Sequence, residues 1–166
     1  MLVSTERFGE LDIEEGRILT FDEGLPGFED LRRFVLLQQD ETSPFVWLQA
    51  VDDPRLAFVA VVPTDFFPGY RLELSEEDRR YLELRRPEEA AVFAIVVVPD
   101  DPREMTANLR APVVINPETR RAKQVIVNTR GYGLKHRLLG GVRPKRRPAR
   151  MGRGEDQPLL SAAALK

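Results

Sequence analysis

The sequence predicts a mainly β protein, a single small antiparallel β-barrel-like domain with one or two short helices. Three observations lead to this fold class. Short segments rich in β-branched and aromatic residues recur along the chain, and clusters of Gly, Pro, Asp and Asn separate them. The intervals are too short for the crossovers of a dozen or more residues that parallel strands need. Such a succession is typical of an antiparallel sheet rolled into a barrel or sandwich.

Nine segments are predicted as strands from their apolar runs or alternation. They are LVST (2–5), ELDI (10–13), RILTF (17–21), FVLLQQ (34–39), FVWLQAV (45–51), LAFVAVV (56–62), AAVFAIVVV (90–98), PVVIN (112–116) and KQVIVN (123–128). The stretch DDPR occurs at 52–55 and again at 100–103, beside two of these strands. Nothing around the two copies repeats, so each is predicted to be a tight turn rather than a sign of duplication.

One helix is predicted to begin after Ser75. Ser75 is a good N-cap, Asp78 follows three residues later as in a capping box, and Tyr81, Leu82 and Leu84 continue the pattern. Glu88 and Glu89, which follow a proline, favour one more helical turn. A second short helix is predicted over residues 29–33.

The composition changes at Gly140. Residues 140–166 are rich in Gly, Pro and Arg, with seven basic residues against two acidic ones, a net charge of +5. The remaining residues, 1–139, carry a net charge of −7. We therefore expect one folded domain over 1–139, followed by a disordered basic tail over 140–166. An acidic body with a basic tail favours basic partners for the body and acidic partners for the tail.

Side chains that support catalysis are scarce. The chain has no cysteine and one histidine, His136, which lies between Lys135 and Arg137 and has no second histidine to share a zinc ion. Phosphate-binding loops and the G-x-S-x-G nucleophile elbow are absent from the sequence. We expect a protein that is not an enzyme and needs no cofactor or metal.

Nothing in the sequence predicts a membrane segment. The N-terminus has no basic region followed by an apolar run, and the longest apolar run, residues 90–98, is far short of the roughly 18 residues of a membrane span. The sequence therefore predicts a cytoplasmic protein.

Two stretches carry candidate partner-binding residues. The first combines aromatic residues around a Pro-Gly turn with the acidic start of the predicted helix: Phe66, Phe67, Tyr70, Glu73, Glu76, Glu77 and Asp78. An apolar anchor with a charged rim is typical of a protein interface. The alternative is that the aromatic rings fill the core and the acidic residues only favour the helix N-terminus.

The second stretch is GLPGFE, residues 24–29. Gly24 and Gly27 allow positive φ and Pro26 fixes its own φ, so this is a specified loop rather than a slack linker. Leu25, Phe28 and Glu29 are its candidate partner-binding residues. The alternative, which we weigh more heavily, is that the glycines turn the chain while Leu25 and Phe28 close the barrel.

Five motifs in order give the chain a resemblance to a known family. They are ILTFDEGLPGFE (18–29), PFVWLQAVDDPRLAF (44–58), PTDFFPGY (63–70), MTANLRAPVVIN (105–116) and KQVIVN with GYGLKH beyond it (123–136). This set resembles the FliW family of bacterial flagellar assembly factors over residues 3–139. The tail from Gly140 lies outside the resemblance.

The resemblance implies a protein-binding regulator with a β-barrel-like fold. Members of the family bind CsrA, a small dimeric RNA-binding repressor of translation, and they also bind flagellin in the cytoplasm. While flagellin remains in the cytoplasm, it occupies the FliW-family protein. Once flagellin is exported, the freed FliW-family protein removes CsrA from the flagellin message. We expect these two partners here, a body that binds no nucleic acid, and a monomer in the absence of partners.

The rival hypothesis is an RNA-binding module that acts through the basic tail. Arginines and lysines of 140–166 suit phosphate contacts without sequence preference. The acidic body argues against it because it would repel RNA.

Overall fold

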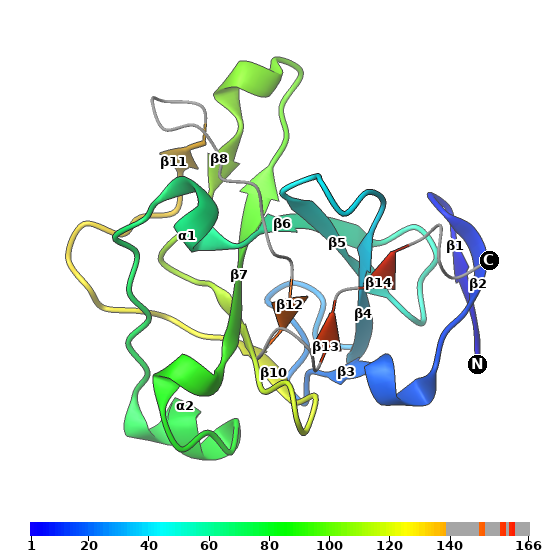
Figure 1. Ribbon diagram of the computed structural model, residues 1–166, viewed down its shortest axis with the longest axis horizontal. Helices are drawn as coiled ribbons and strands as arrows, with labels where there is room; N and C mark the ends of the chain where they lie inside the picture. The colour runs from blue at the N-terminus through cyan, green and yellow to red at the C-terminus, as the bar shows by residue number, and fades with distance from the viewer. Residues whose placement is uncertain (139–149, 152–156, 159, 162–166) are drawn as a thin grey trace.

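The computed structural model describes residues 1–138, 150–151, 157–158 and 160–161 (Figure 1). Eleven strands lie within residues 1–138. They are β1 (Leu2–Thr5), β2 (Gly9–Asp12), β3 (Leu19–Thr20), β4 (Arg33–Gln38), β5 (Phe45–Ala50), β6 (Ala57–Val61), β7 (Ala91–Val97), β8 (Thr106–Ala107), β9 (Val113–Ile115), β10 (Ala122–Gln124) and β11 (His136–Arg137).

The strands of the main sheet follow the order β10-β9-β7-β6-β5-β4, and each neighbouring pair is antiparallel. Its two ends come close together through β3, which pairs with β4. Thr20 N donates to Arg120 O at 2.9 Å, and Thr20 forms a single bridge with Arg121, next to β10. The sheet is therefore curved almost full circle but is not closed by a continuous ladder. The predicted mainly β, antiparallel, barrel-like fold is confirmed.

Strand β4 shows how the sheet buries residues on both faces. Phe34 and Leu36 belong to the cluster that fills the inside of the curved sheet, and Val35 and Leu37 belong to a second cluster on the outside. The hairpin of β1 and β2 covers that outer cluster and lies at one side of the molecule in Figure 1. Because side chains alternate along a strand, burial on both faces makes β4 read as a continuous apolar run.

Two α-helices lie within residues 1–138. α2 (Glu76–Tyr81) begins as predicted, with the Ser75 side chain accepting a hydrogen bond from Asp78 N at 3.0 Å. The other helix is α1 (Pro63–Phe66), with a proline at its first position. The predicted helix over 29–33 is wrong, because residues 29–32 form turns and loop and Arg33 opens β4. Short 3₁₀ turns occupy Glu15–Arg17, Pro87–Glu89 and Pro102–Glu104, the second of them as predicted.

Both DDPR stretches are turns, as predicted. In each copy an aspartate side chain accepts from the backbone two residues on: Asp53 from Arg55 N and Asp101 from Arg103 N, both at 3.0 Å. The buried Gln49 also stabilises the first turn, because its Nε2 donates to Ala50 O and Leu56 O on the two sides of the turn. Much of the long motif at 44–58 therefore serves the fold.

The C-terminal segment is described at six residues. β12 (Arg150–Met151) pairs with β13 (Gln157–Pro158), and β14 (Leu160–Ser161) pairs in parallel with Leu37 and Gln38 of β4. The rest of the predicted disordered tail over 140–166, together with the predicted domain boundary at 139, lies outside the described residues.

Candidate partner-binding groove

The glycine loop, residues 24–29, is a tight and rigid turn. Gly24 has φ +65°, and a Cβ built on it would lie 2.6 Å from Glu29 Cα, so only glycine fits there. Gly27 has φ +87° but open space around it. Leu25 and Phe28 form a bridge in which Phe28 N donates to Leu25 O at 2.7 Å. The loop thus sends its side chains in two directions: Leu25 is buried in the central cluster, and Phe28 remains 38% exposed.

Glu29 places a carboxylate at the tip of this loop. Its Oε2 accepts a hydrogen bond from Gly27 N at 3.0 Å. That bond lowers the pKa of the Glu29 carboxyl below its ordinary value, and the side chain stays exposed to water. The charge is therefore held in place beside Pro26 and Gly27 rather than swinging freely.

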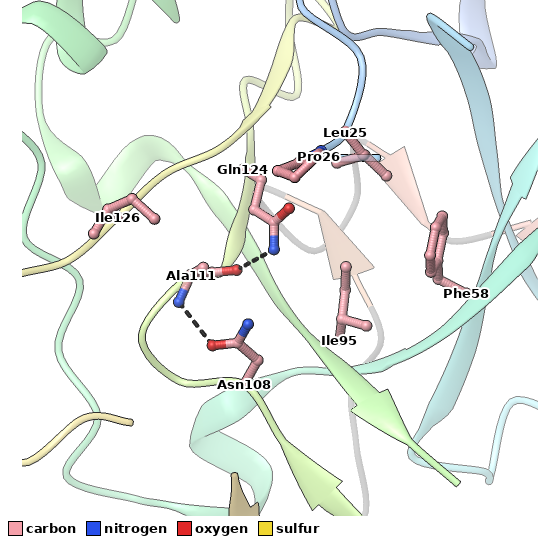
Figure 2. A pocket seen from close by; sticks show the side chains of 8 residues that line it. All are labelled: Leu25, Pro26, Phe58, Ile95, Asn108, Ala111, Gln124 and Ile126. Carbon is pink, nitrogen blue, oxygen red and sulfur yellow. Dashed lines mark hydrogen bonds between the residues drawn. The ribbon is translucent and has the colours of Figure 1, made fainter. Parts of the chain in front are cut away.

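A groove of about 340 Å³ opens next to the loop. It is lined by residues from five separate parts of the chain: Leu25, Pro26, Phe58, Ile95, Asn108, Ala111, Gln124 and Ile126 (Figure 2). The Phe28 ring extends the apolar surface, since it contacts the edge of Phe58 with ring centroids 5.5 Å apart. Ile126, which follows β10, is 59% exposed, whereas its neighbours Val125 and Val127 are buried.

The groove exists because the sheet opens at β7. The first half of β7 pairs with β9, ending at Phe93 opposite Val113, and its second half pairs with β8, starting at Val96 opposite Ala107. Between these pairs β7 has two residues, whereas the opposite chain has residues 108–112. This long bulge leaves the sheet, held to β7 by Asn108 N donating to Ile95 O at 2.9 Å. The groove is the space that the bulge leaves open.

Two side-chain amides stand at this opening. Asn108 Oδ1 accepts from Arg110 N and Ala111 N at 3.1 and 3.0 Å, and Gln124 Nε2 donates to Ala111 O at 2.9 Å. These bonds use one end of each amide and fix its orientation. The other ends, Asn108 Nδ2 and Gln124 Oε1, bond to none of the described residues and lie beside the groove in Figure 2. Within the described part of the chain, one donor and one acceptor at the apolar groove therefore have no protein partner.

The predicted aromatic residues of the 66–70 turn lie mainly in the core. Phe66 and Tyr70 are buried in one cluster, and the Tyr70 hydroxyl donates to Leu109 O at 2.9 Å. Phe67 is half-buried with its ring against His136 at 5.8 Å between centroids. His136 itself accepts from Gly133 N through Nε2 at 2.7 Å, a structural role. This geometry favours the alternative left open by the sequence, in which the rings support the fold.

Most of the predicted acidic residues are already engaged. Glu76 is paired with Arg79 and Arg80, and the Arg79 hydrogen bond lowers the pKa of the Glu76 carboxyl. Asp78 pairs with Lys123 at 2.7 Å, which ties α2 to β10. Glu73 accepts from the Thr129 hydroxyl. Of the four, Glu77 makes no hydrogen bond or ion pair with a described residue and is exposed.

The two predicted candidate sites lie on opposite faces of one segment. Along 123–127, Lys123 contacts α2, and Val125 and Val127 pack in the cluster beneath that helix. The alternate residues, Gln124 and Ile126, line the groove. Because neighbouring side chains of an extended chain point to opposite faces, the loop residues and the acidic cluster cannot form one continuous site there.

All but one of the lining residues were not among the predicted site residues: Pro26, Phe58, Ile95, Asn108, Ala111, Gln124 and Ile126. Only Ile126 left a signal in the sequence. It stands between Val125 and Val127, and in such a run one face must point away from the other two.

The chemistry of the groove suits binding rather than catalysis. None of its lining residues titrates near neutral pH. Within the described part of the chain, no group of three or more His, Cys, Asp or Glu side chains could hold a metal ion. Over the same residues, no helix has the length and apolar character of a membrane span.

Comparisons with known proteins agree on one family. The chain matches the family model described as FliW protein over residues 2–138. It is 40% identical over 140 residues to the flagellar assembly factor FliW of Caldanaerobacter subterraneus subsp. tengcongensis, covering 84% of this chain and 93% of that relative. It is 43% identical over 139 residues to the factor of the same name from Bdellovibrio bacteriovorus, covering 84% of this chain and 79% of that relative.

A solved structure supports the same assignment. The fold is similar to a crystal structure of the flagellar assembly factor FliW, with a TM-score of 0.79 and 38% identity. The match covers 85% of this chain and 99% of that one. The chain therefore belongs to the FliW family of flagellar assembly factors.

Proposed function

We propose that this flagellar assembly factor is a cytoplasmic protein-binding regulator that binds the translational repressor CsrA and also binds flagellin. The observation that supports this most is the family match over residues 2–138, which spans the described body of the protein. In this proposal, flagellin that awaits export occupies the protein. Export of flagellin frees it to bind CsrA, which lifts repression of the flagellin message and couples flagellin synthesis to flagellum assembly.

The charge of the body fits such a partner. Residues 1–139 carry a net charge of −7, whereas an RNA-binding repressor presents a basic surface to phosphates. Opposite charge accelerates encounter and disfavours other acidic surfaces, including RNA itself. The proposal therefore includes no direct binding of nucleic acid by the body, no catalytic activity, and a monomeric protein in the absence of partners.

Of the two candidate surfaces, the groove is the stronger. Ile126 lines it and Phe28 packs on its lining residue Phe58, and both Ile126 and Phe28 are exposed. Phe66 and Tyr70 are buried and unable to contact a partner without unfolding. Exposed apolar side chains with a polar rim are the usual energetic centre of a protein interface. The acidic start of α2 then has a secondary role, which Glu77 is best placed to fill because it is exposed and unpaired with described residues.

The test is direct binding of purified CsrA and flagellin from the host bacterium to the full chain. Ile126→Ser removes an exposed groove residue, and Leu134→Ser is its matched control because both side chains are 59% exposed. We expect I126S to weaken binding of at least one partner by about tenfold, as for a central interface residue, and L134S to change neither.

Glu77→Lys tests the secondary surface at low and moderate salt. If α2 steers the partner, E77K slows association with CsrA at low salt and less so at moderate salt, because salt screens exposed charges. Equal association rates for E77K and the unaltered protein would exclude this surface. Absence of any CsrA and flagellin binding to the unaltered protein would contradict the proposed function itself.

A further inference from the structure

We propose that the groove recognises a backbone amide of an extended apolar segment of a protein partner, with basic residues at the end of that segment next to the glycine loop. This inference rests on the proposed function in that it takes the chain to act by binding proteins. It goes further by naming the chemistry of the segment bound and the residues that read it.

The free ends of Asn108 and Gln124 supply the first argument. A peptide backbone offers one carbonyl acceptor and one N–H donor per residue. Asn108 Nδ2 offers a donor and Gln124 Oε1 an acceptor, and the internal bonds of both amides prevent them from flipping. Polar groups that lose water without gaining a partner are costly, so an occupant of this groove must supply both bonds.

The apolar walls of the groove determine which side chains it can bind. Apart from the two amides, the groove is lined by Leu, Pro, Phe, Ile and Ala side chains, and Phe28 and Ile126 stand exposed at its margin. Its volume of about 340 Å³ lies near the lower end of the roughly 300–1,000 Å³ typical of small-ligand pockets. It holds a few side chains of a segment rather than a whole domain element. The apolar walls and the two side-chain amides together accommodate apolar side chains on either side of one backbone amide.

Charge supplies the third argument and sets the direction of the segment. Residues 21–31, which include the glycine loop, carry Asp22, Glu23, Glu29 and Asp30 and no lysine or arginine. Asp22 is paired with Arg121 at 3.4 Å, and the Glu29 charge is fixed beside Pro26. On the bulge side of the groove, Arg110 is exposed. A bound segment therefore gains by placing its basic residues toward the loop and away from Arg110.

A random library of 12-residue peptides, panned against the immobilised full chain, tests the proposal without assuming a natural ligand. We expect the enriched peptides to combine two or more apolar residues with Lys or Arg at one end. Binding of an enriched, fluorescently labelled peptide, measured by anisotropy, should weaken about tenfold in I126S, stay unchanged in L134S, and weaken as salt rises.

Asn108→Ser isolates the amide donor. A serine hydroxyl can still accept from the backbone two or three residues on, which preserves the turn, but it is too short to donate into the groove. We expect N108S to unfold at nearly the same temperature as the unaltered protein and to bind the peptide several-fold more weakly. If N108S proves unstable, Gln124→Met, which removes the acceptor and keeps the length of the side chain, takes its place.

The proposal is overturned if no peptide is enriched, if the enriched peptides are acidic, or if they bind I126S and N108S as well as the unaltered protein. Its failure is separable from failure of the proposed function. CsrA or flagellin that binds N108S and I126S undiminished overturns the inference and leaves the function standing. Groove-dependent peptide binding without binding of either protein leaves the inference standing and removes the function.

Discussion

At the residue scale, Gly24 and Gly27 separate two reasons why a loop requires glycine. Both have positive φ, which costs a residue with a Cβ about 1 kcal/mol. Only Gly24 also lies against backbone, with Glu29 O at 2.7 Å from a built Cβ. Backbone cannot rotate out of the way as a side chain can, so the Gly24 site has no cheap means of relaxing.

This difference predicts the effects of two alanine variants. Gly24→Ala should lower the free energy of unfolding by roughly 2–4 kcal/mol, since it combines strained backbone with overpacking. Gly27→Ala should cost about 1 kcal/mol, since nothing lies within 4 Å of its Cβ. Urea denaturation of both variants measures this. Equal losses of unfolding free energy in the two variants would show that the loop moves aside at Gly24 and is not rigid.

Tyr70 gives a pH-dependent prediction. Burial raises the pKa of its phenol to about 12 from the ordinary value of 10.0, with Tyr132 adding to the shift. Between these values the unfolded chain loses the proton that the folded chain keeps. The folded state then binds more protons, so its stability is complete below about pH 10 and falls as the pH rises toward 12.

Tyr70→Phe should therefore reverse its effect with pH. Near neutral pH the variant should be less stable by about 1 kcal/mol, because the hydrogen bond to Leu109 O is lost. Toward pH 12 the unaltered protein loses on the order of 2 kcal/mol of its free energy of unfolding, and the variant does not lose it because it has no phenol at this position. Urea denaturation of both proteins from pH 8 to 11.5 should show the difference in unfolding free energy closing and then changing sign. A constant gap would mean that Tyr70 ionises in the folded state as readily as in the unfolded chain.

At the element scale, α2 depends on its N-cap residue, Ser75. It has six residues, none of them fully buried, and three acidic residues in its first turn. A helix this short does not persist by itself, so capping and docking must hold it. The Ser75 cap acts at the start, and the Asp78–Lys123 pair, with both side chains largely buried, docks it to β10.

Ser75→Ala should therefore lower the free energy of unfolding by about 1 kcal/mol, the usual cost of a lost N-cap. Ser4→Ala is a suitable control, because Ser4 lies exposed on β1 and caps no helix. Hydrogen exchange of the α2 amides should accelerate in S75A while the amides of β5 and β6 keep their protection. A stability loss in S4A as large as that in S75A would contradict the capping explanation.

Elements with a local cause were predictable from sequence. The cap at Ser75 and the aspartate turns of both DDPR stretches involve residues two or three positions apart, and their side chains alone determine them. The helix expected over 29–33 failed because longer-range pairing decided it. Arg33 pairs with Thr20 of β3, and Glu29 turns back to Gly27. Five residues of helical propensity cannot compete with a strand that completes the sheet.

At the scale of the whole molecule, the groove shows what the sequence could not reveal. Its residues come from the glycine loop, β6, β7, the 108–112 bulge, and β10 together with the residues that follow it. The bulge itself follows from two registers, Phe93 opposite Val113 and Val96 opposite Ala107, and neither is visible without the pairing of the strands. The sequence indicated a specified glycine loop and contained MTANLRAPVVIN as a family motif, but it did not reveal that the two lie at one opening.

The acidic body should fold without the basic C-terminal segment. A protein truncated to residues 1–138 should fold cooperatively, with a melting temperature lowered by a few degrees at most. The described members of all four hydrophobic clusters lie between Val3 and Leu138, and the pairing of β14 with β4 involves two residues of each strand. Loss of cooperative melting on truncation would show that this edge pairing is part of the core structure.

The same truncation separates the two kinds of partner by charge. Removing 139–166 takes away a net +5 and leaves a body of −7. Any RNA binding by the full chain should then disappear, because phosphate contacts scale with the basic residues that make them. Association with CsrA, the proposed basic partner, should instead quicken at low salt and return to the full-length rate as salt rises, because the tail no longer offsets the negative charge of the body. RNA binding that survives truncation, or CsrA association that slows, would mean that the basic segment takes part in the partner site itself.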